Sequence, residues 1–377
     1  MNLRAIPKPA ILGILFLTCS CRALIYNVPG LKDYKIFPYR EIQNSPESVF
    51  HFDYAPPDQN YGKLLLTNNN ILLPDAVTLE EYASGTKTAA YLVIRNDTIL
   101  FEKYNKGYQE SSIFNTFSVT KAFITTLVGI ALMEGKIQSL DQSITEFLPE
   151  LKEIEGFDKI TLRHLLLHTS GIAFSDTRFS VFSDNAKYYY GRNLRKLVTK
   201  ADLYIEPGQE IRYGSTNVQL LGMALEKATG TSISAYLEEK IWKKIGMQYP
   251  ATWSLDSKRE EGMEKAFSSL NCRAVDLAKL GRLYLHRGLW EDERILPEAF
   301  VEEATRRDTT AGSSWNFQYN FRQGPELYGS YYARGLFGQL IYIYPKKNII
   351  IVRVGETDLH YNPQFMNYNV LQIIDQL

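Results

Sequence analysis

Ser118 and Lys121 are the residues whose types and spacing first suggest chemistry. A hydroxyl and an amine three positions apart share one face of a helix, so both side chains would point into the same small volume. Ser118 also precedes a long apolar stretch, which places it at a helix N-terminus, where unpaired N–H groups and the helix dipole favour a developing anion. The pair therefore supplies a nucleophile, a nearby base and half of an oxyanion site.

This spacing needs support, because the chain holds a second S-x-x-K string at residues 84–87. Ser84 lies beside a glycine and ahead of a strand-like run, which is typical of a turn. Ser118 instead leads into residues 122–132, which are apolar nearly all round and predict a buried helix that ends at Gly135. From these residues alone, a catalytic and a structural Ser118 both stay open.

Three further strings follow in chain order: L-L-L-H-T-S-G at residues 165–171, Y-G-S at residues 213–215, and a glycine-containing stretch at residues 333–339. Together with Ser118 and Lys121 they resemble the serine β-lactamase and penicillin-binding-protein superfamily. Within it, the chain is most similar to the class C β-lactamase-related hydrolases, which include esterases, D-amino-acid peptidases and 6-aminohexanoate-dimer hydrolases. The resemblance covers about residues 89–377.

The resemblance implies a mechanism and the residues that carry it. Ser118 would attack an amide or ester carbonyl and form an acyl-enzyme that water resolves, with no metal or organic cofactor. Tyr213, a phenol beside the desolvated Lys121, would act as general base to Ser118 and later as acid to the leaving group. The string that contains His168 would brace the catalytic helix and take no part in the chemistry.

Two departures from the family pattern bear on the substrate. Ser215 stands where many members have Asn, and Leu336 stands where the closing strand usually carries a Lys or His that binds a substrate carboxylate. Gly338 is then the glycine of that strand motif, and a backbone N–H near Gly338 and Gln339 would complete the oxyanion hole. Arg334 is the candidate substitute for the lost cation. We therefore expect β-lactams to be turned over poorly relative to small esters.

Two other groups of residues carry competing interpretations. His164 and His168 are four positions apart, like a zinc pair, but no Glu stands beside His164 and no third ligand is apparent. We interpret both histidines as structural. Tyr190 ends a run of three tyrosines in a polar loop, and it is either a substrate-contacting aromatic or ordinary loop packing.

The elements that must position these residues follow from apolar periodicity. Residues 89–104 predict a β-hairpin, and residues 339–344 and 349–354 predict two more strands, followed by a helix over about 364–377. Residues 122–305 are mostly helical in pattern, with clear helices over 217–229 and 274–285. Strands near both ends of the chain predict an α+β fold, in which one antiparallel sheet is flanked by helices and carries an inserted helical subdomain.

Composition limits the partners. The chain has 377 residues, and its 42 basic side chains equal its 42 acidic ones, so nothing in the charge points to nucleic acid or acidic lipid. The three cysteines suggest neither a disulfide framework nor a metal cluster. The expected partner is a small-molecule amide or ester substrate.

Residues 1–21 predict an export signal, because Arg4 and Lys8 precede an apolar run that is too short to span a bilayer comfortably. The segment that ends at Cys21 resembles a loose bacterial lipoprotein cleavage box. Cys21 would then carry a lipid, and the protein would lie in the periplasm or at the outer membrane; a plain signal peptide or an uncleaved anchor is the alternative. Residues 22–85 predict an extended arm with a strand near 49–52 and little functional content, ahead of a hydrolase domain over 86–377.

Two hypotheses of function follow. The first is a serine hydrolase that uses Ser118, Lys121 and Tyr213. The second is a catalytically weak or inactive penicillin-binding-like protein that binds cell-wall peptides or related ligands. The three intact residues favour the first hypothesis, whereas Leu336 in the closing strand keeps the second one open.

Overall fold

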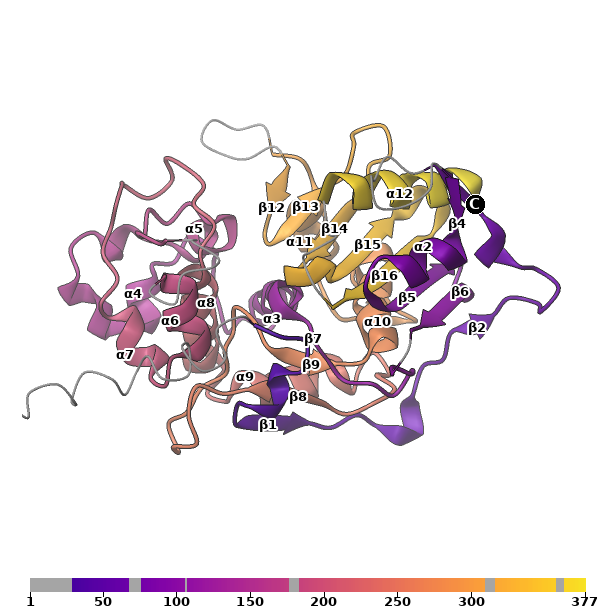
Figure 1. Ribbon diagram of the computed structural model, residues 1–377. Helices are drawn as coiled ribbons and strands as arrows, with labels where there is room; N and C mark the ends of the chain where they lie inside the picture. The colour runs from indigo at the N-terminus through magenta and orange to yellow at the C-terminus, as the bar shows by residue number, and fades with distance from the viewer. Residues whose placement is uncertain (1–28, 68–75, 106, 176–182, 309–315, 357–362) are drawn as a thin grey trace, which may run out of the picture.

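The centre of the fold is a single eight-stranded sheet, described here from a computed structural model that covers residues 29–67, 76–105, 107–175, 183–308, 316–356 and 363–377. The strand order is β12-β13-β14-β15-β16-β5-β6-β2, and all neighbours are antiparallel except β2 and β6. The predicted antiparallel sheet, built from both ends of the chain, is confirmed (Figure 1). Its strands are β2 (Asp53–Tyr54), β5 (Thr88–Arg95), β6 (Thr98–Tyr104), β12 (Phe317–Gln318), β13 (Phe321–Gln323), β14 (Tyr331–Arg334), β15 (Leu340–Tyr344) and β16 (Ile349–Gly355).

The middle strands β5 and β16 are buried along almost their whole length, which explains their continuous apolar sequences. The hairpin between β5 and β6 turns at Asn96 and Asp97, whose φ angles are 50° and 57°. Two successive positive φ angles match the twist of the flanking strands, and Asn and Asp tolerate them better than most residues. The predicted hairpin is therefore confirmed together with its turn.

Helices cover both faces of the sheet (Figure 1). On one face, α2 (Leu79–Gly85) and α12 (Pro363–Gln376) share an apolar cluster with Tyr91, Tyr342 and Ile351. On the other face, α10 (Ala274–Leu285) packs so closely that a Cβ atom on Gly281 would lie 2.8 Å from the side chain of Ile350. A glycine is needed there because only a hydrogen atom fits between helix and sheet.

The inserted part of the chain is mostly helical, as predicted, and the helices expected over 217–229 and 274–285 are confirmed. It also contributes two strands to a small second sheet of order β1-β8-β9-β7, which helical periodicity did not reveal. The remaining helices are α4 (Ile144–Phe147), α5 (Leu162–Leu167), α6 (Asp184–Tyr190), α7 (Leu194–Val198), α8 (Ser215–Thr229), α9 (Ile233–Leu237) and α11 (Glu298–Thr305); the small sheet holds β1 (Tyr39–Ile42), β7 (Phe114–Asn115), β8 (Ala251–Ser254) and β9 (Leu270–Cys272).

The N-terminal arm adds strands to both sheets from residue 29 onward. β1 pairs with β8, β2 adds an edge to β6, and β3 (Leu65–Thr67) pairs with β4 (Ala76–Thr78). The strand expected near residues 49–52 is wrong, because these residues are irregular and the pairing starts only at Asp53. Cys21 and the predicted signal segment lie outside the described residues. Among the helices of the described ranges, none is long and apolar enough to cross a membrane.

Helix α3 (Thr120–Met133) lies between the helical part and the large sheet (Figure 1). Every residue from Thr120 to Ala131 is buried, as the sequence predicted for a helix that is apolar nearly all round. A Cβ atom on Gly129 would lie 2.5 Å from the side chain of Leu296, so α3 is packed without spare room. The helix ends just before Gly135, whose φ angle of 67° suits a glycine.

The packing of α3 can be tested with Leu127→Ala. Leu127 is 0% exposed, so removing its side chain should lower the free energy of unfolding by about 2–5 kcal/mol through lost burial and a residual cavity. Met133→Ala in the same helix is the matched control, because Met133 is 44% exposed and should change stability by about 0.5 kcal/mol or less. Urea titration measures both; equal losses would contradict the buried position of α3.

Candidate active site

A short, strained turn presents Ser118. β7 leads through a 3-10 turn (Phe117–Val119) into α3, so Ser118 lies one turn before the α-helix, where it is half-buried. Phe117, directly before it, has a φ angle of 46°, which is unusual for a bulky residue. Asn115 holds the turn, because its side-chain Oδ1 accepts the Phe117 N–H at 2.9 Å. Ser118 therefore lies on a constrained turn that directly precedes the N-terminus of α3.

Lys121 meets Ser118 as the helical spacing predicted. Its side chain is almost fully buried, and Nζ donates to Ser118 Oγ at 3.0 Å and to the backbone carbonyl of Phe267 at 2.6 Å. These two acceptors compensate for much of the cost of burying an ammonium group. The predicted pair is thus brought together around a shared hydrogen bond.

Tyr213 completes the group from the segment just before α8. Lys121 Nζ lies 5.1 Å from the centre of the Tyr213 ring, and the Tyr213 oxygen takes hydrogen bonds from Ser118 and Lys121. Burial alone would raise the pKa of Tyr213, but the Lys121 charge, these hydrogen bonds and the charge of Arg322 together lower it below its usual value. A lower pKa makes the phenolate form of Tyr213 more accessible, and the phenolate is the form that can accept a proton from Ser118.

His168 stands behind Tyr213 and does not contact Ser118 in any described interaction. The two rings are stacked, with centres 4.6 Å apart and planes 19° from parallel. Burial lowers the pKa of His168 to about 3, so the ring is neutral at physiological pH. Its Nδ1 accepts the Gly214 N–H at 3.1 Å, and Nε2 therefore carries the proton and donates to Asn320 Oδ1 at 2.9 Å.

The contact with Asn320 continues to the catalytic helix. Asn320 Nδ2 donates to Thr125 Oγ1 at 3.0 Å, and Thr125 Oγ1 donates to the Tyr319 carbonyl at 2.9 Å. His168 thus links the ring of Tyr213 to α3 through two hydrogen bonds. This agrees with our interpretation that the string at residues 165–171 braces the catalytic helix.

Gly335 lies directly beside the turn that carries Ser118. A Cβ atom on Gly335 would lie 3.1 Å from the Ser118 nitrogen and 2.8 Å from the Thr116 carbonyl, so Gly335 packs directly against the nucleophile turn. The Gln339 N–H is instead bonded within its own turn, to the Leu336 carbonyl at 3.4 Å. The oxyanion role of Gly338 and Gln339 stays a prediction, and the backbone around Gly335 is a second candidate for it.

Gln339 and Gly338 have a supporting role. The Gln339 side chain accepts the Gly355 N–H at 2.7 Å and donates to the Asn115 carbonyl at 3.4 Å. Arg353, buried on β16, donates to the Phe337 and Gly338 carbonyls at 3.0 Å each. These bonds fix the turn after Gly335 against β16 and β7.

No described interaction joins Arg334 or Tyr190 to Ser118. Arg334 is the last residue of β14, where it pairs with Leu340 of β15, and its role as the substitute cation stays a prediction. Tyr190 is 3% exposed and packs against Phe37 of the N-terminal arm. Tyr190 therefore packs on the arm, and contact of its ring with a substrate stays a prediction.

Ser215 is the first residue of α8, two positions after Tyr213, and is nearly buried. It is therefore close to Tyr213 in sequence and belongs to the element that positions it. No interaction described here connects Ser215 with Ser118, so its role in substrate contact stays a prediction.

Arg322 is a functional candidate that sequence patterns missed. It lies on β13, in the edge hairpin with β12, and its guanidinium carbon is 5.6 Å from the centre of the Phe317 ring. Phe317 in turn packs edge-on against His168 and Tyr213, at 5.4 Å and 6.0 Å. The Arg322 charge also lowers the pKa of Tyr213. No motif surrounds this arginine in the sequence, and only the hairpin brings it near the site.

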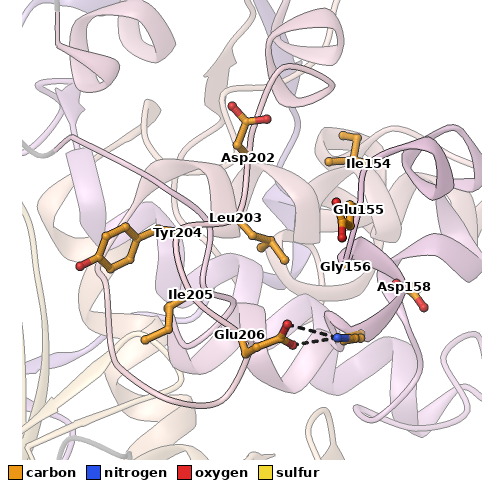
Figure 2. A pocket seen from close by; sticks show the side chains of 10 residues that line it. Ile154, Glu155, Gly156, Asp158, Asp202, Leu203, Tyr204, Ile205 and Glu206 are labelled. Carbon is orange, nitrogen blue, oxygen red and sulfur yellow. Dashed lines mark hydrogen bonds and ion pairs between the residues drawn. The ribbon is translucent and has the colours of Figure 1, made fainter.

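A separate surface hollow lies in the helical part, and the three predicted catalytic residues do not line it. Figure 2 shows this hollow of about 640 Å³, formed by the loops over residues 154–159 and 202–206. Glu206 pairs there with Lys159 at 3.0 Å, as the dashed lines mark. His164 does not line the hollow; it belongs to a helix cap, where Nδ1 accepts the Thr161 N–H. Within the described ranges no group of three His, Cys, Asp or Glu side chains is arranged to hold a metal ion.

Comparisons with known proteins identify a family and several relatives. The model of the beta-lactamase family matches residues 76–364. A 6-aminohexanoate-dimer hydrolase from Paenarthrobacter ureafaciens is 26% identical over 303 residues, which cover 75% of each chain. Esterase EstB from Burkholderia gladioli is 28% identical over 181 residues, covering 42% of this chain and 45% of EstB. A Bacillus anthracis structure, assigned as a candidate 6-aminohexanoate-dimer hydrolase, has a TM-score of 0.80 at 23% identity and covers 92% of each chain.

Arg322→Gln should change the pH dependence of the reaction. The Arg322 charge lowers the pKa of Tyr213, so its removal should raise that pKa and move the ascending limb of kcat/KM to higher pH. A shift on the order of half a pH unit is expected for one partly screened charge. Arg334→Gln is the control and should leave the limb in place, because the charge of Arg334 is not among those that act on the pKa of Tyr213. The prediction fails if both variants give the wild-type profile.

Proposed function

The chain belongs to the beta-lactamase family, and we propose that it hydrolyses an ester or amide through an acyl-enzyme formed on Ser118. It is a β-lactamase-related hydrolase, since relatives that span most or part of its length are hydrolases and esterases. The observation that carries the proposal is the hydrogen-bonded group of Ser118, Lys121 and Tyr213. This group contains a nucleophile and a proton acceptor in direct contact.

Acylation would begin with transfer of the Ser118 proton to the Tyr213 oxygen while Oγ attacks the carbonyl carbon of the substrate. The Lys121 ammonium, within hydrogen-bond distance of Oγ, stabilises the negative charge during this step. The carbonyl oxygen becomes an oxyanion, for which we propose the N–H groups of Ser118 and Leu336. The Gly335 N–H donates to the Gln339 carbonyl, just before β15. Because the backbone of Gly335 is extended, the N–H of the next residue, Leu336, points the other way.

The tetrahedral intermediate would collapse when Tyr213 returns its proton to the leaving alcohol or amine, which leaves the acyl group on Ser118. A water molecule then takes the place of the leaving group. Tyr213 accepts a proton from this water, the hydroxide attacks the ester carbonyl, and the proton returns to Ser118 Oγ as the acid product departs. Acylation and deacylation together consume one water molecule, and Ser118 and Tyr213 suffice for the proton transfers.

The competing hypothesis is a protein that acylates slowly or only binds its ligand. A penicillin-binding protein from Bacillus subtilis, 30% identical over 140 residues, gives this alternative its support, although the match covers 36% of this chain. Direct contact among Ser118, Lys121 and Tyr213 favours turnover, because a pure binding site gains nothing from a nucleophile bonded to a proton acceptor.

We also propose that the protein is exported and carries a lipid on Cys21. The support is the basic start, the short apolar run and the small residue before Cys21 in the sequence. A lipid at this position would hold the hydrolase at a bacterial envelope surface. Cys21→Ala should then release the protein from the membrane fraction.

Labelling with a fluorophosphonate probe tests the nucleophile. Intact-protein mass spectrometry should show a single adduct on the wild type and none on Ser118→Ala, because only an activated serine attacks the probe. Ser84→Ala is the matched control from the second S-x-x-K string; the Ser84 hydroxyl donates to the Glu80 carbonyl at 2.8 Å, as a structural helix residue does. An adduct that survives in Ser118→Ala would exclude the mechanism.

Relative rates on two substrate types test the effect of Leu336. With no Lys or His on the closing strand at this position, we expect kcat/KM for nitrocefin to be at least about 100-fold below that for p-nitrophenyl butyrate. Both are followed by absorbance with the same enzyme preparation, and Ser118→Ala gives the background. Rapid nitrocefin hydrolysis would contradict the expected preference for esters.

A further inference from the structure

A chain of hydrogen bonds runs from the nucleophile turn into the N-terminal arm. The Asn115 side chain lies at its centre: Oδ1 accepts the Phe117 N–H at 2.9 Å, and Nδ2 donates to the Tyr189 hydroxyl at 3.0 Å. A carboxamide presents its acceptor and donor on opposite sides, so these two bonds fix the orientation of the Asn115 amide. The position of the Tyr189 hydroxyl therefore bears on the turn directly before Ser118.

The donor and acceptor of each hydrogen bond along this path follow from the number of protons that each group carries. A phenol has one proton, and since the Tyr189 oxygen accepts from Asn115, that proton is available for Asp33. Tyr189 donates to Asp33 Oδ2 at 3.0 Å, and the same oxygen accepts the Gly30 N–H at 2.9 Å. Asp33 is thus an acceptor at the end of an ordered path that starts at the backbone of Phe117.

Packing contacts follow the same path. The Tyr189 ring stacks over Phe117, with centres 6.4 Å apart, and meets Phe37 of the arm edge-on at 5.4 Å. The Asn115 N–H also donates to the Leu31 carbonyl at 3.2 Å. Lys265, which is 0% exposed, lies 4.8 Å from the centre of the Phe37 ring. Residues 30–37 of the arm therefore pack behind the turn that precedes Ser118, partly through Tyr189.

The turn needs such a support. A φ angle of 46° at a phenylalanine persists only when the surroundings hold it, and this residue directly precedes the nucleophile. We propose that Tyr189 and Asp33 are positioning residues, which hold the Asn115 amide and through it the strained turn that aims Ser118 at the substrate carbonyl. The proposal rests on the hydrolase function proposed above. It gives residues 30–37 of the arm a role in positioning the nucleophile, whereas the sequence suggested little functional content there.

Tyr189→Phe tests the proposal, because it removes one hydroxyl and keeps the ring. We expect kcat for p-nitrophenyl butyrate to fall about tenfold while KM stays within about twofold, since a misaimed nucleophile affects the chemical step more than binding. The rate of fluorophosphonate labelling at Ser118 should fall with kcat. Tyr190→Phe is the matched control: it removes a hydroxyl from the next residue of α6, whose ring also packs on Phe37 at 6.2 Å, and should keep wild-type kcat.

Two variants at Asp33 provide an independent test. Asp33→Asn keeps an oxygen that can accept from Tyr189, so it should retain most of kcat, whereas Asp33→Ala should lose about as much as Tyr189→Phe. A merely structural role would lower the melting temperature of both alanine and phenylalanine variants without this order in kcat. If Tyr189→Phe does not yield folded protein, the pair at Asp33 decides the question by itself.

The outcomes separate this proposal from the proposed function. A wild type without Ser118-dependent labelling or ester hydrolysis overturns both. An active wild type with Tyr189→Phe and Asp33→Ala equal to Tyr190→Phe in kcat overturns the positioning role alone. A selective loss of kcat in Tyr189→Phe and Asp33→Ala, with Asp33→Asn and Tyr190→Phe active, supports it.

Discussion

The buried ammonium group of Lys121 is the constraint on which the site depends. Its side chain is only 2% exposed, and a charge removed from water is costly unless hydrogen bonds replace the lost solvent. The replacements are Ser118 Oγ and the Phe267 carbonyl, which come from the nucleophile turn and from a loop far along the chain. Both acceptors are in place only when α3 and that loop are packed. The orientation of the nucleophile is therefore coupled to the requirement that a buried cation be satisfied.

The same charge determines the proton chemistry around it. In the described part of the chain, the charged groups that act on Tyr213 are two cations, Lys121 and Arg322, which favour the phenolate. Burial, and then those cations, disfavour a charged imidazole at His168, although its bond to Asn320 acts the other way. A neutral His168 can accept the Gly214 N–H and stack on Tyr213 without adding a third positive charge. One electrostatic arrangement thus suits the two stacked rings to different roles: Tyr213 to the proton transfer that we propose, and His168 to support of the neighbouring ring.

Local features of the sequence predicted the parts of the site that depend on local geometry. The spacing of Ser118 and Lys121, the buried nature of α3 and the sheet assembled from both ends follow from helix and strand periods. The contact of Gly335 with the Ser118 nitrogen does not, because the strand motif directed attention to Gly338 and only the folded chain shows which glycine lies beside the serine. Arg322 escaped prediction for a related reason. Only the edge hairpin of β12 and β13 brings it near Tyr213, through the ring of Phe317.

The three tyrosines of α6 show why residue type alone could not identify their roles. Successive residues on a helix point about 100° apart, so identical side chains reach three different surroundings. Tyr188 packs on Phe267, whose carbonyl holds Lys121; Tyr189 stacks on Phe117; and Tyr190 packs on Phe37. The sequence drew attention to the run, but the contacts that matter are with backbone turns and with an arm more than a hundred residues away. A backbone carbonyl or a strained φ angle has no sequence signature, so the contacts of these three tyrosines could be identified only from the folded chain.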